Sequence, residues 1–284
     1  MPRAPRLDPL DGIHHVVNRG IDHGDVFVDE SARLDFGRCI GVIADRFGVR
    51  ILAYCLMTNH FHLVIRCPVA QLPDAMKYLS GVFTRHLNDR LGRDGPIFRG
   101  RYTSRLITTS RYVLNAVGYT LRNVLDLPGV RSVEQYRWSS HRAYLGLRPT
   151  PPWLDTDHVL QWFRDATAFH RHVSRPSGTA TVGDVDAPTL LDAIGFLLAA
   201  RNDDDGRVRP GDVRVVALHI ADLVDSHSAG EIVRALGFPN DTARRNAESR
   251  ARRRLDADPT LRALGADAIG LSSLGGLDDL GEAA

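Results

Sequence analysis

The stretch that decides the fold is residues 49–66, which reads VRILAYCLMTNHFHLVIR. Val49 to Cys55 is rich in residues that favour strands, Met57-Thr58-Asn59 resembles a turn, and His60 to Arg66 is a second strand. Two such runs joined by a short turn predict an antiparallel hairpin.

The flanking sequence places strands and helices around this hairpin. A strand is expected at Ile13–Arg19, and a helix capped by Ser31 is expected to run to about Phe47. Further helices are expected from about Leu72 to Leu91 and from near Ser110, with a Gly- and Arg-rich loop from Gly92 to Arg105 between them. Strands interleaved with helices, two of the strands hairpin-like, predict a ferredoxin-like α+β sandwich.

Two histidines share one face of the second hairpin strand. Side chains at i and i+2 of a strand point to the same side, so His60 and His62 project together. Phe61, Leu63 and Ile65 then point to the other, core-facing side. Two imidazoles held close on a rigid strand can share one divalent ion. The alternative is a polar sheet face that carries two histidines by chance.

The helix after Ser110 adds polar groups that suit a phosphate-cutting site. Its apolar stripe consists of Val113, Val117, Leu121 and Val124. At roughly 100° per residue, Tyr119 faces away from this stripe, and Asn123 lies one turn further on the same side. Tyr112 lies on almost the same side of the helix, and spacing alone does not choose between the two tyrosines. An ordinary polar helix face is the alternative.

Four segments, in order, carry a resemblance to a known family. They are Tyr54 through Val64, Gly95 through Tyr102, Tyr112 through Asn123, and Trp138-Ser139-Ser140 with Tyr144. Over about residues 12–150 the chain resembles the REP-associated tyrosine transposases, a branch of the single-tyrosine HUH transposases. Two positions depart from the usual family pattern, because Thr58 and Val124 stand where the family commonly has proline.

The resemblance implies a role for each candidate site residue. The family's metal-binding histidine pair falls on His60 and His62, its helix-borne third ligand on Asn123, and its nucleophile on Tyr119, whereas Tyr112 matches a different family tyrosine. A phenol has a pKa near 10 and is a poor nucleophile at neutral pH without a nearby cation. Mg²⁺ or Mn²⁺ would polarise the scissile phosphate, and attack would leave a 5′-phosphotyrosine and a free 3′-OH.

Arginines gather where the DNA would be held. Of the 36 Lys and Arg residues, only Lys77 is a lysine. Between residues 90 and 105 the arginines are Arg90, Arg93, Arg99, Arg101 and Arg105, with Phe98 and Tyr102 among them. Cations that follow phosphates and aromatic rings that stack on bases are typical of single-strand binding. A solvated charged loop is the alternative.

The remaining sequence predicts a second, helical DNA-binding module. We expect a transposase domain over residues 1–150, a helical extension and linker over 151–188, a helical module over 189–262 and a disordered tail over 263–284. Ser228 and Glu231 form a capping box, Gly237 is a helix stop, and Asn240 or Asp241 caps a basic helix. The basic helix carries the expected duplex-DNA contacts Arg244, Arg245 and Arg250.

This arrangement is that of a helix-turn-helix. It is similar to the DNA-binding domain of the replication initiator DnaA, although the His-Thr typical of that recognition helix is absent. A helical bundle with a solvated basic face is the alternative.

Bulk properties favour a cytoplasmic protein that is associated with the nucleoid when bound to DNA. Hydrophobic content is 43%, and neither a membrane-spanning stretch nor a secretion signal is recognised, so no membrane partner is expected. The three cysteines, Cys39, Cys55 and Cys67, are an odd number without CxxC spacing. They are expected to be reduced core thiols, with neither a disulfide nor a zinc site.

Three functions follow from these patterns. The leading one is a metal-dependent single-stranded DNA endonuclease and strand transferase that acts on hairpin-forming repeat DNA. A non-catalytic DNA-binding regulator derived from a transposase is the alternative, and a phosphodiesterase that uses water is a third. Covalent capture of DNA distinguishes the first from the others, while the choice between monomer and homodimer stays open.

Overall fold

The computed structural model describes residues 8–107, 110–174, 190, 191, 194, 210–221, 226–258 and 261. The chain divides into two compact units, with the boundary between Ser174 and Arg175. The first unit therefore includes the segment after residue 150 that the sequence assigned to an extension. Each unit is described by itself. None of the described helices combines the length and the apolar character needed to cross a membrane.

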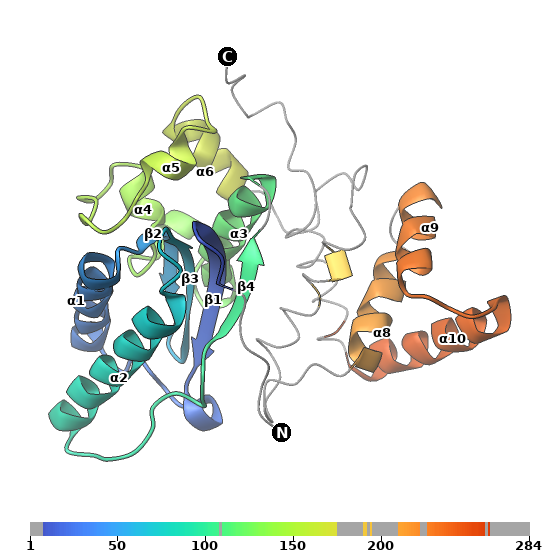
Figure 1. Cartoon of the computed structure of the whole chain (residues 1–284), viewed down its shortest axis with the longest axis horizontal. Coiled ribbons are helices and arrows are strands. Elements are labelled where there is room, and N and C mark those ends of the chain that lie inside the picture. The colour runs from blue at the N-terminus through green and yellow to red at the C-terminus, as the bar shows by residue number, and fades with distance from the viewer. Residues whose placement is uncertain are drawn as a thin grey trace. The chain divides into compact units, whose positions relative to one another are not determined.

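The first unit is built on a four-stranded antiparallel sheet, in agreement with the expected α+β class (Figure 1). The strands are β1 (Gly12–Arg19), β2 (Arg50–Leu56), β3 (His60–Cys67) and β4 (Thr103–Ile107), in the order β2-β3-β1-β4. A hydrogen bond from the Met57 amide to the His60 carbonyl, 2.9 Å long, closes the turn of the predicted hairpin. The hairpin is therefore confirmed.

Strand β4 corrects the expectation of a continuous loop from Gly92 to Arg105. Thr103–Ile107 pairs with β1, with Thr103 opposite Val17 and Ile107 opposite Ile13. Its sequence, TSRLI, lacks the alternation of apolar and polar residues that marks a strand. Its first four residues are half-buried, and only Ile107 is buried. Pairing with β1 at the edge of the sheet supplies the hydrogen bonds that define it.

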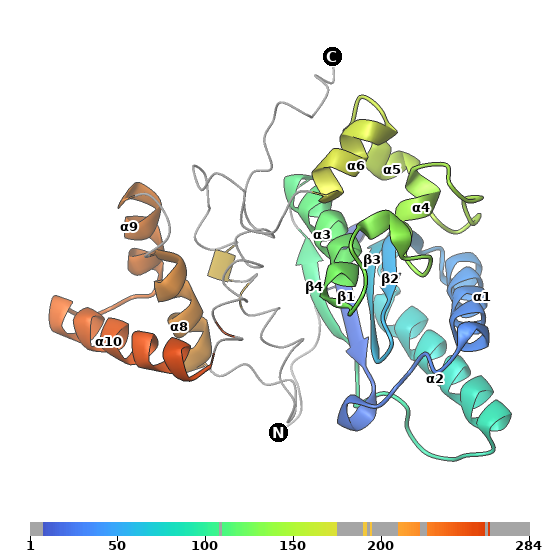
Figure 2. The same ribbon diagram turned by 180° about the vertical axis from the view of Figure 1, so that it is seen from behind.

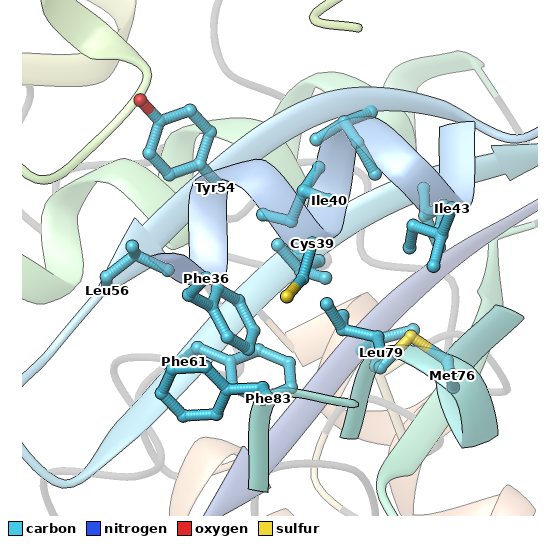
Figure 3. Packing of buried hydrophobic residues seen from close by; sticks show 14 of the residues in the cluster. Phe36, Cys39, Ile40, Ile43, Tyr54, Leu56, Phe61, Met76, Leu79 and Phe83 are labelled. Carbon is cyan, nitrogen blue, oxygen red and sulfur yellow. The ribbon is translucent and has the colours of Figure 1, made fainter. Parts of the chain in front are cut away.

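Helices α1 (Glu30–Phe47) and α2 (Leu72–Leu91) cover one face of the sheet (Figures 1 and 2). The cap of α1 is Asp29 and not Ser31, because the Asp29 carboxylate accepts a hydrogen bond from the Ala32 amide at 2.7 Å. Beneath these helices lies the main core (Figure 3). Its phenylalanine rings contact one another, and they are Phe27, Phe36, Phe61, Phe83 and Phe98.

Helix α3 (Ser110–Arg122) packs against the other face of the sheet, and α6 (Ala166–Ser174) packs on α3. The short helices η1 (Ile21–His23), η2 (Asn123–Asp126), η3 (Val133–Gln135), α4 (His141–Tyr144) and α5 (Asp157–Leu160) complete the unit. The α-helix ends at Arg122, and the Asn123 side-chain amide donates to the Tyr119 carbonyl at 2.8 Å. In a continuing α-helix that carbonyl would accept from the Asn123 backbone amide.

The second unit contains α8 (Pro210–Ala221), α9 (Ser226–Ala235) and α10 (Asp241–Ala257). Helix α9 begins at Ser226, so Ser228 lies inside the helix and is not its cap. Gly237 follows this helix with φ +62°, and the Asn240 side chain caps α10 by accepting from the Ala243 amide at 2.8 Å. The predicted linker over 175–188 and tail over 263–284 lie outside the described residues.

Replacing Phe36 with alanine tests the core. Its ring is fully buried, so we expect Phe36→Ala to lower the free energy of unfolding by about 3–5 kcal/mol through lost burial and a cavity. Leu34→Ala on the same helix is the control, because Leu34 is 50% exposed and should change stability by less than about 1 kcal/mol. Guanidinium unfolding followed by tryptophan fluorescence reports this unit, since Trp138, Trp153 and Trp162 all belong to it. Equal losses in the two variants would contradict this core.

Candidate functional site

The register between β1 and β3 gathers the candidate site on the sheet face that α3 covers. Arg19 lies opposite His60, and Val17 lies opposite His62. Alternation along β1 therefore places His15, Val17 and Arg19 on the same face as the histidine pair. Phe61, Leu63 and Ile65 lie in the core on the opposite face, as predicted.

His62 is the centre of a buried cluster of rings. Its Nδ1 atom lies 3.1 Å from Nε2 of His15, and its ring centroid lies 5.1 Å from that of His60. The Tyr119 ring of α3 meets both histidines edge-on, with centroids 5.7 Å from His15 and 5.8 Å from His62. Thr120 Oγ1 lies 3.4 Å from His15 Nε2. The strand histidines and the helix tyrosine, distant in sequence, therefore meet.

The neighbouring residue Asn59 sets the proton position of His60. Asn59 Nδ2 donates to the His23 carbonyl at 3.2 Å, which orients the amide so that its oxygen faces His60. Asn59 Oδ1 lies 2.7 Å from His60 Nδ1, and an amide oxygen can only accept a hydrogen bond. Nδ1 of His60 must therefore carry the proton, which leaves the lone pair of Nε2 available to a ligand.

Burial keeps these histidines neutral. Desolvation, with a smaller contribution from the Arg19 guanidinium, lowers the pKa of His60 to about 3. Desolvation followed by Arg105 lowers the pKa of His15 to about 3. The pKa of His62 is also well below its ordinary value, first because of burial and then because of its histidine neighbours. Neutral imidazoles are the form that binds metal ions.

The structure gives Asn123 a definite amide orientation. Its nitrogen donates to the Tyr119 carbonyl, so its oxygen is the atom that can act as an acceptor or ligand. The side chain is 9% exposed and belongs to η2 directly after α3. Tyr112, the rival tyrosine of the sequence, lies in α3, but its side chain is outside the described residues.

The arginines predicted to hold single-stranded DNA lie in different places. Arg105 lies on β4 opposite His15, and the Arg99 amide bonds to the Arg19 carbonyl at 2.9 Å, beside the end of β1. Arg101 is exposed next to β4, whereas Arg93 donates to Asn88 after the end of α2. Arg99 and Arg105 are thus placed along β1, the strand that carries His15 and Arg19.

Two aromatic residues of this segment are not available to stack on bases. Phe98 and Tyr102 are each 6% exposed and belong to the main core. The expectation that they contact DNA is therefore wrong. Burying a large ring stabilises the fold by removing apolar surface from water, and this outweighed the surface role inferred from their arginine neighbours.

In the second unit, the arginines expected to contact duplex DNA lie on α10. Arg244 is paired within the helix, with Nη1 2.5 Å from the Glu248 carboxylate and Nε 3.5 Å from that of Asp241. Arg245 and Arg250 are exposed. Arg250 also lines a hollow between α8 and α10 together with Arg214 and Phe238.

His15, Thr120 and Arg19 belong to the site but were missed in the sequence. The pattern from Ile13 to Arg19 places His15 and Arg19 on one strand face, and this signal was available. What the sequence lacks is the register that sets this strand beside His60 and His62.

Residues 11–121 match the family model described as "Transposase IS200 like". Residues 11–121 form an IS200-like transposase domain. The matched span of this transposase domain includes β1 to β4 and most of α3, and with them His60, His62 and Tyr119. The family match confirms the expected kinship and assigns the domain a transposase role.

No curated protein sequence matches the chain. Among solved structures, the chain is similar to one described as "Structure of the REP associates tyrosine transposase bound to a REP hairpin", at 15% identity and a TM-score of 0.46. The alignment covers 55% of this chain and 94% of that one.

The hydrogen bond at Asn59 predicts a single tautomer for His60 in the transposase domain. In metal-free protein at pH 7 we expect the Nδ1–H form, because the Asn59 oxygen requires a donor and His60 is neutral. Long-range ¹H–¹⁵N correlation spectra of the histidine rings measure this directly. Asn59→Ala should increase the Nε2–H population, and a dominant Nε2–H form in the unmodified protein would contradict the assignment.

Proposed function

We propose that the transposase domain cuts and rejoins single-stranded DNA with Tyr119 as the nucleophile. The phenolic oxygen attacks a DNA phosphorus, the bond to the 3′ oxygen breaks, and a 5′-phosphotyrosine forms. The 3′ oxygen takes up a proton in place of the one that the phenol gives up. The observation that carries the proposal is the packing of the Tyr119 ring against His62, at 5.8 Å between centroids.

The residues beside Tyr119 fit a divalent metal ion. His60 is neutral and has its Nε2 lone pair available, and His62 Nδ1 is engaged with His15, which leaves His62 Nε2. Asn123 offers its amide oxygen because its nitrogen is bonded to the Tyr119 carbonyl. Mixed nitrogen and oxygen donors suit Mn²⁺, and Mg²⁺ with additional waters. When bound, such an ion would polarise the scissile phosphate and favour the ionised phenol.

His15 is proposed as a positioning residue. It lies against both His62 and Tyr119, and its Nε2 atom lies within 3.4 Å of Thr120 Oγ1 on α3. It therefore links the strand that carries the metal ligands to the helix that carries the nucleophile. Fixing both partners in one arrangement lowers the cost of reaching an attacking geometry.

Cations around the site would hold the DNA backbone. Arg19 lies opposite His60, and Arg105 lies opposite His15. Arg99 and Arg101 belong to the segment between α2 and β4, where the Arg99 amide bonds to the Arg19 carbonyl at the end of β1. We propose single-stranded, hairpin-forming repeat DNA as the substrate, with the exposed arginines of α10 binding duplex DNA nearby. The domain over 1–150 would cut, and the helical module over 189–262 would place the enzyme.

A covalent-trapping experiment tests the proposal. Full-length protein is mixed with Mn²⁺ and labelled single-stranded hairpin oligonucleotides from repeats that flank its gene, and the products are separated on a denaturing gel. Tyr119→Phe should lower the yield of protein–DNA adduct roughly a thousandfold or more, because removal of a nucleophile abolishes the covalent step. Tyr112→Phe is the matched control on the same helix and should keep the adduct.

The other outcomes identify the competing functions. Cleavage without an adduct would point to the phosphodiesterase that uses water. Retarded but uncut DNA, across several hairpins and with either metal ion, would favour the DNA-binding regulator. An adduct that survives Tyr119→Phe and is lost in Tyr112→Phe would move the nucleophile to the other tyrosine.

A further inference from the structure

On the sheet face opposite the candidate active site, three metal-ligating side chains converge. Asp8, His14 and Cys67 each offer a ligand atom, and these atoms all lie within 4.8 Å of one another. They come from the segment before β1, from β1 and from the end of β3. We propose that they form a structural site for Zn²⁺ or a similar transition-metal ion, independent of the function proposed above.

The backbone register brings two of these ligands to one face. His14 lies opposite Ile65, and Gly12 lies opposite Cys67, so His14 and Cys67 share the face of Ile65, which is in the main core. His15, the next residue, points to the face of His62. The adjacent histidines of β1 therefore serve opposite sides of the sheet.

The spacing of the ligand atoms suits a small tetrahedral ion. His14 Nε2 and Asp8 Oδ1 are 3.3 Å apart. Two ligands at about 2.0–2.1 Å from a tetrahedral Zn²⁺ are separated by about 3.3–3.4 Å, as the distances of zinc sites require. Three protein ligands leave a fourth position for a water molecule.

The burial of His14 favours a bound ion between these groups. Its side chain is 0% exposed, and its Nδ1 atom has no hydrogen-bond partner among the described residues. Its Nε2 atom and Asp8 Oδ1 face each other at 3.3 Å, the distance of a long ion-pair contact. Buried polar groups that are poorly satisfied destabilise a fold, and a cation held between these two atoms would engage both.

The surrounding contacts hold the ligands in place. The second oxygen of Asp8 accepts from the Leu72 amide at the start of α2, at 2.9 Å. The Asp11 carboxylate pairs with Arg66 through two hydrogen bonds of 2.6 and 2.8 Å, which fixes the segment before β1 against β3. Such outer contacts orient metal ligands and raise affinity.

Gly12 keeps the space beside the histidine open. A Cβ atom at this position would lie 2.9 Å from His14 Nε2 and 3.0 Å from the Pro9 carbonyl oxygen. A side chain there would therefore crowd the nitrogen that is proposed to bind the ion.

The chemistry of the donors selects the ion. A thiolate, an imidazole and a carboxylate together suit Zn²⁺ or Co²⁺ and not Mg²⁺, which prefers oxygen donors. Burial, with a smaller contribution from Asp8, raises the pKa of Cys67 to about 12, so the thiol keeps its proton in the metal-free protein. Binding of the ion would release that proton to the buffer.

A second cluster of similar composition is a weaker candidate. Asp35, Cys39 and His86 also place their ligand atoms within 4.8 Å of one another. Arg38, however, lies 3.1 Å from the Asp35 carboxylate, and His86 is 45% exposed. The arginine competes with an ion for the carboxylate, and none of the three side chains has a buried nitrogen or oxygen atom without a hydrogen-bond partner.

Titration with Co²⁺ tests the proposed site, because a thiolate bound to Co²⁺ gives a charge-transfer band in the near ultraviolet that nitrogen and oxygen ligands do not. Full-length protein stripped of metal is titrated in its absorption spectrum. The titration runs past two equivalents, because the histidine pair of the proposed active site can also take Co²⁺. We expect the thiolate band to saturate together with the visible bands of a tetrahedral ion. Cys67→Ser should abolish the charge-transfer band, and Asp8→Asn should weaken binding at least about tenfold.

Matched controls separate this site from other thiols and from the histidine pair. Cys39→Ser and Cys55→Ser remove the other two buried cysteines and should keep the band. The double variant His60→Ala with His62→Ala removes the candidate active-site ligands and should also keep it.

The result that overturns the proposal is a wild-type spectrum without a thiolate band, or a band that persists in Cys67→Ser. The wild-type spectrum is decisive even if a variant fails to fold. Loss of the covalent DNA adduct has no bearing on this result, so failures of the two proposals are distinguishable.

Discussion

The antiparallel register between β1 and β3 is the constraint on which both proposed metal sites depend. It sets Arg19 opposite His60 and Gly12 opposite Cys67, and these pairs lie at the two ends of the same ladder. A shift of one residue would turn every β1 side chain to the other face of the sheet. His15 would then enter the main core, and His14 would face the candidate active site. The core residues Val16, Leu63 and Ile65 oppose such a shift, because it would expose or misplace their buried side chains.

Helix α3 packs over the sheet face that carries the candidate active site. Its sheet-facing side brings Tyr119 and Thr120 to the histidines, while α6 covers its other side. Burial of the histidines beneath this helix lowers their pKa values and keeps them neutral. The proposed metal site would therefore need little reorganisation on binding an ion.

Much of the fold could be predicted from the sequence, and the failures have physical causes. The hairpin from Val49 to Arg66 and the bounds of α2 follow from strand and helix periodicity, which are local properties. Strand β4 was not predicted, because its hydrogen bonds depend on β1, which is distant in sequence, and not on a pattern in its own residues. Phe98 was misassigned for the same reason, because its arginine neighbours suggested a surface and only the fold shows the ring in the core.

The candidate site likewise contains residues that local periodicity predicts and residues that only the fold brings together. His60 and His62 could be paired from the strand period, and Tyr119 with Asn123 from the helix period. The meeting of the two elements, and the place of His15 between them, required the register and the docking of α3. The possible ligand Cys67 was set aside because its spacing from other cysteines carries no signal, whereas its partners are an aspartate and a histidine far along the chain.

Anomalous diffraction from crystals of the protein grown with Mn²⁺ tests most directly whether the histidine pair forms a metal centre beside Tyr119. We expect an anomalous peak within coordinating distance of Nε2 of both His60 and His62, on the sheet face that Tyr119 and His15 share. Manganese bound elsewhere, with no peak between the two histidines at full occupancy of the crystal's other sites, would contradict it.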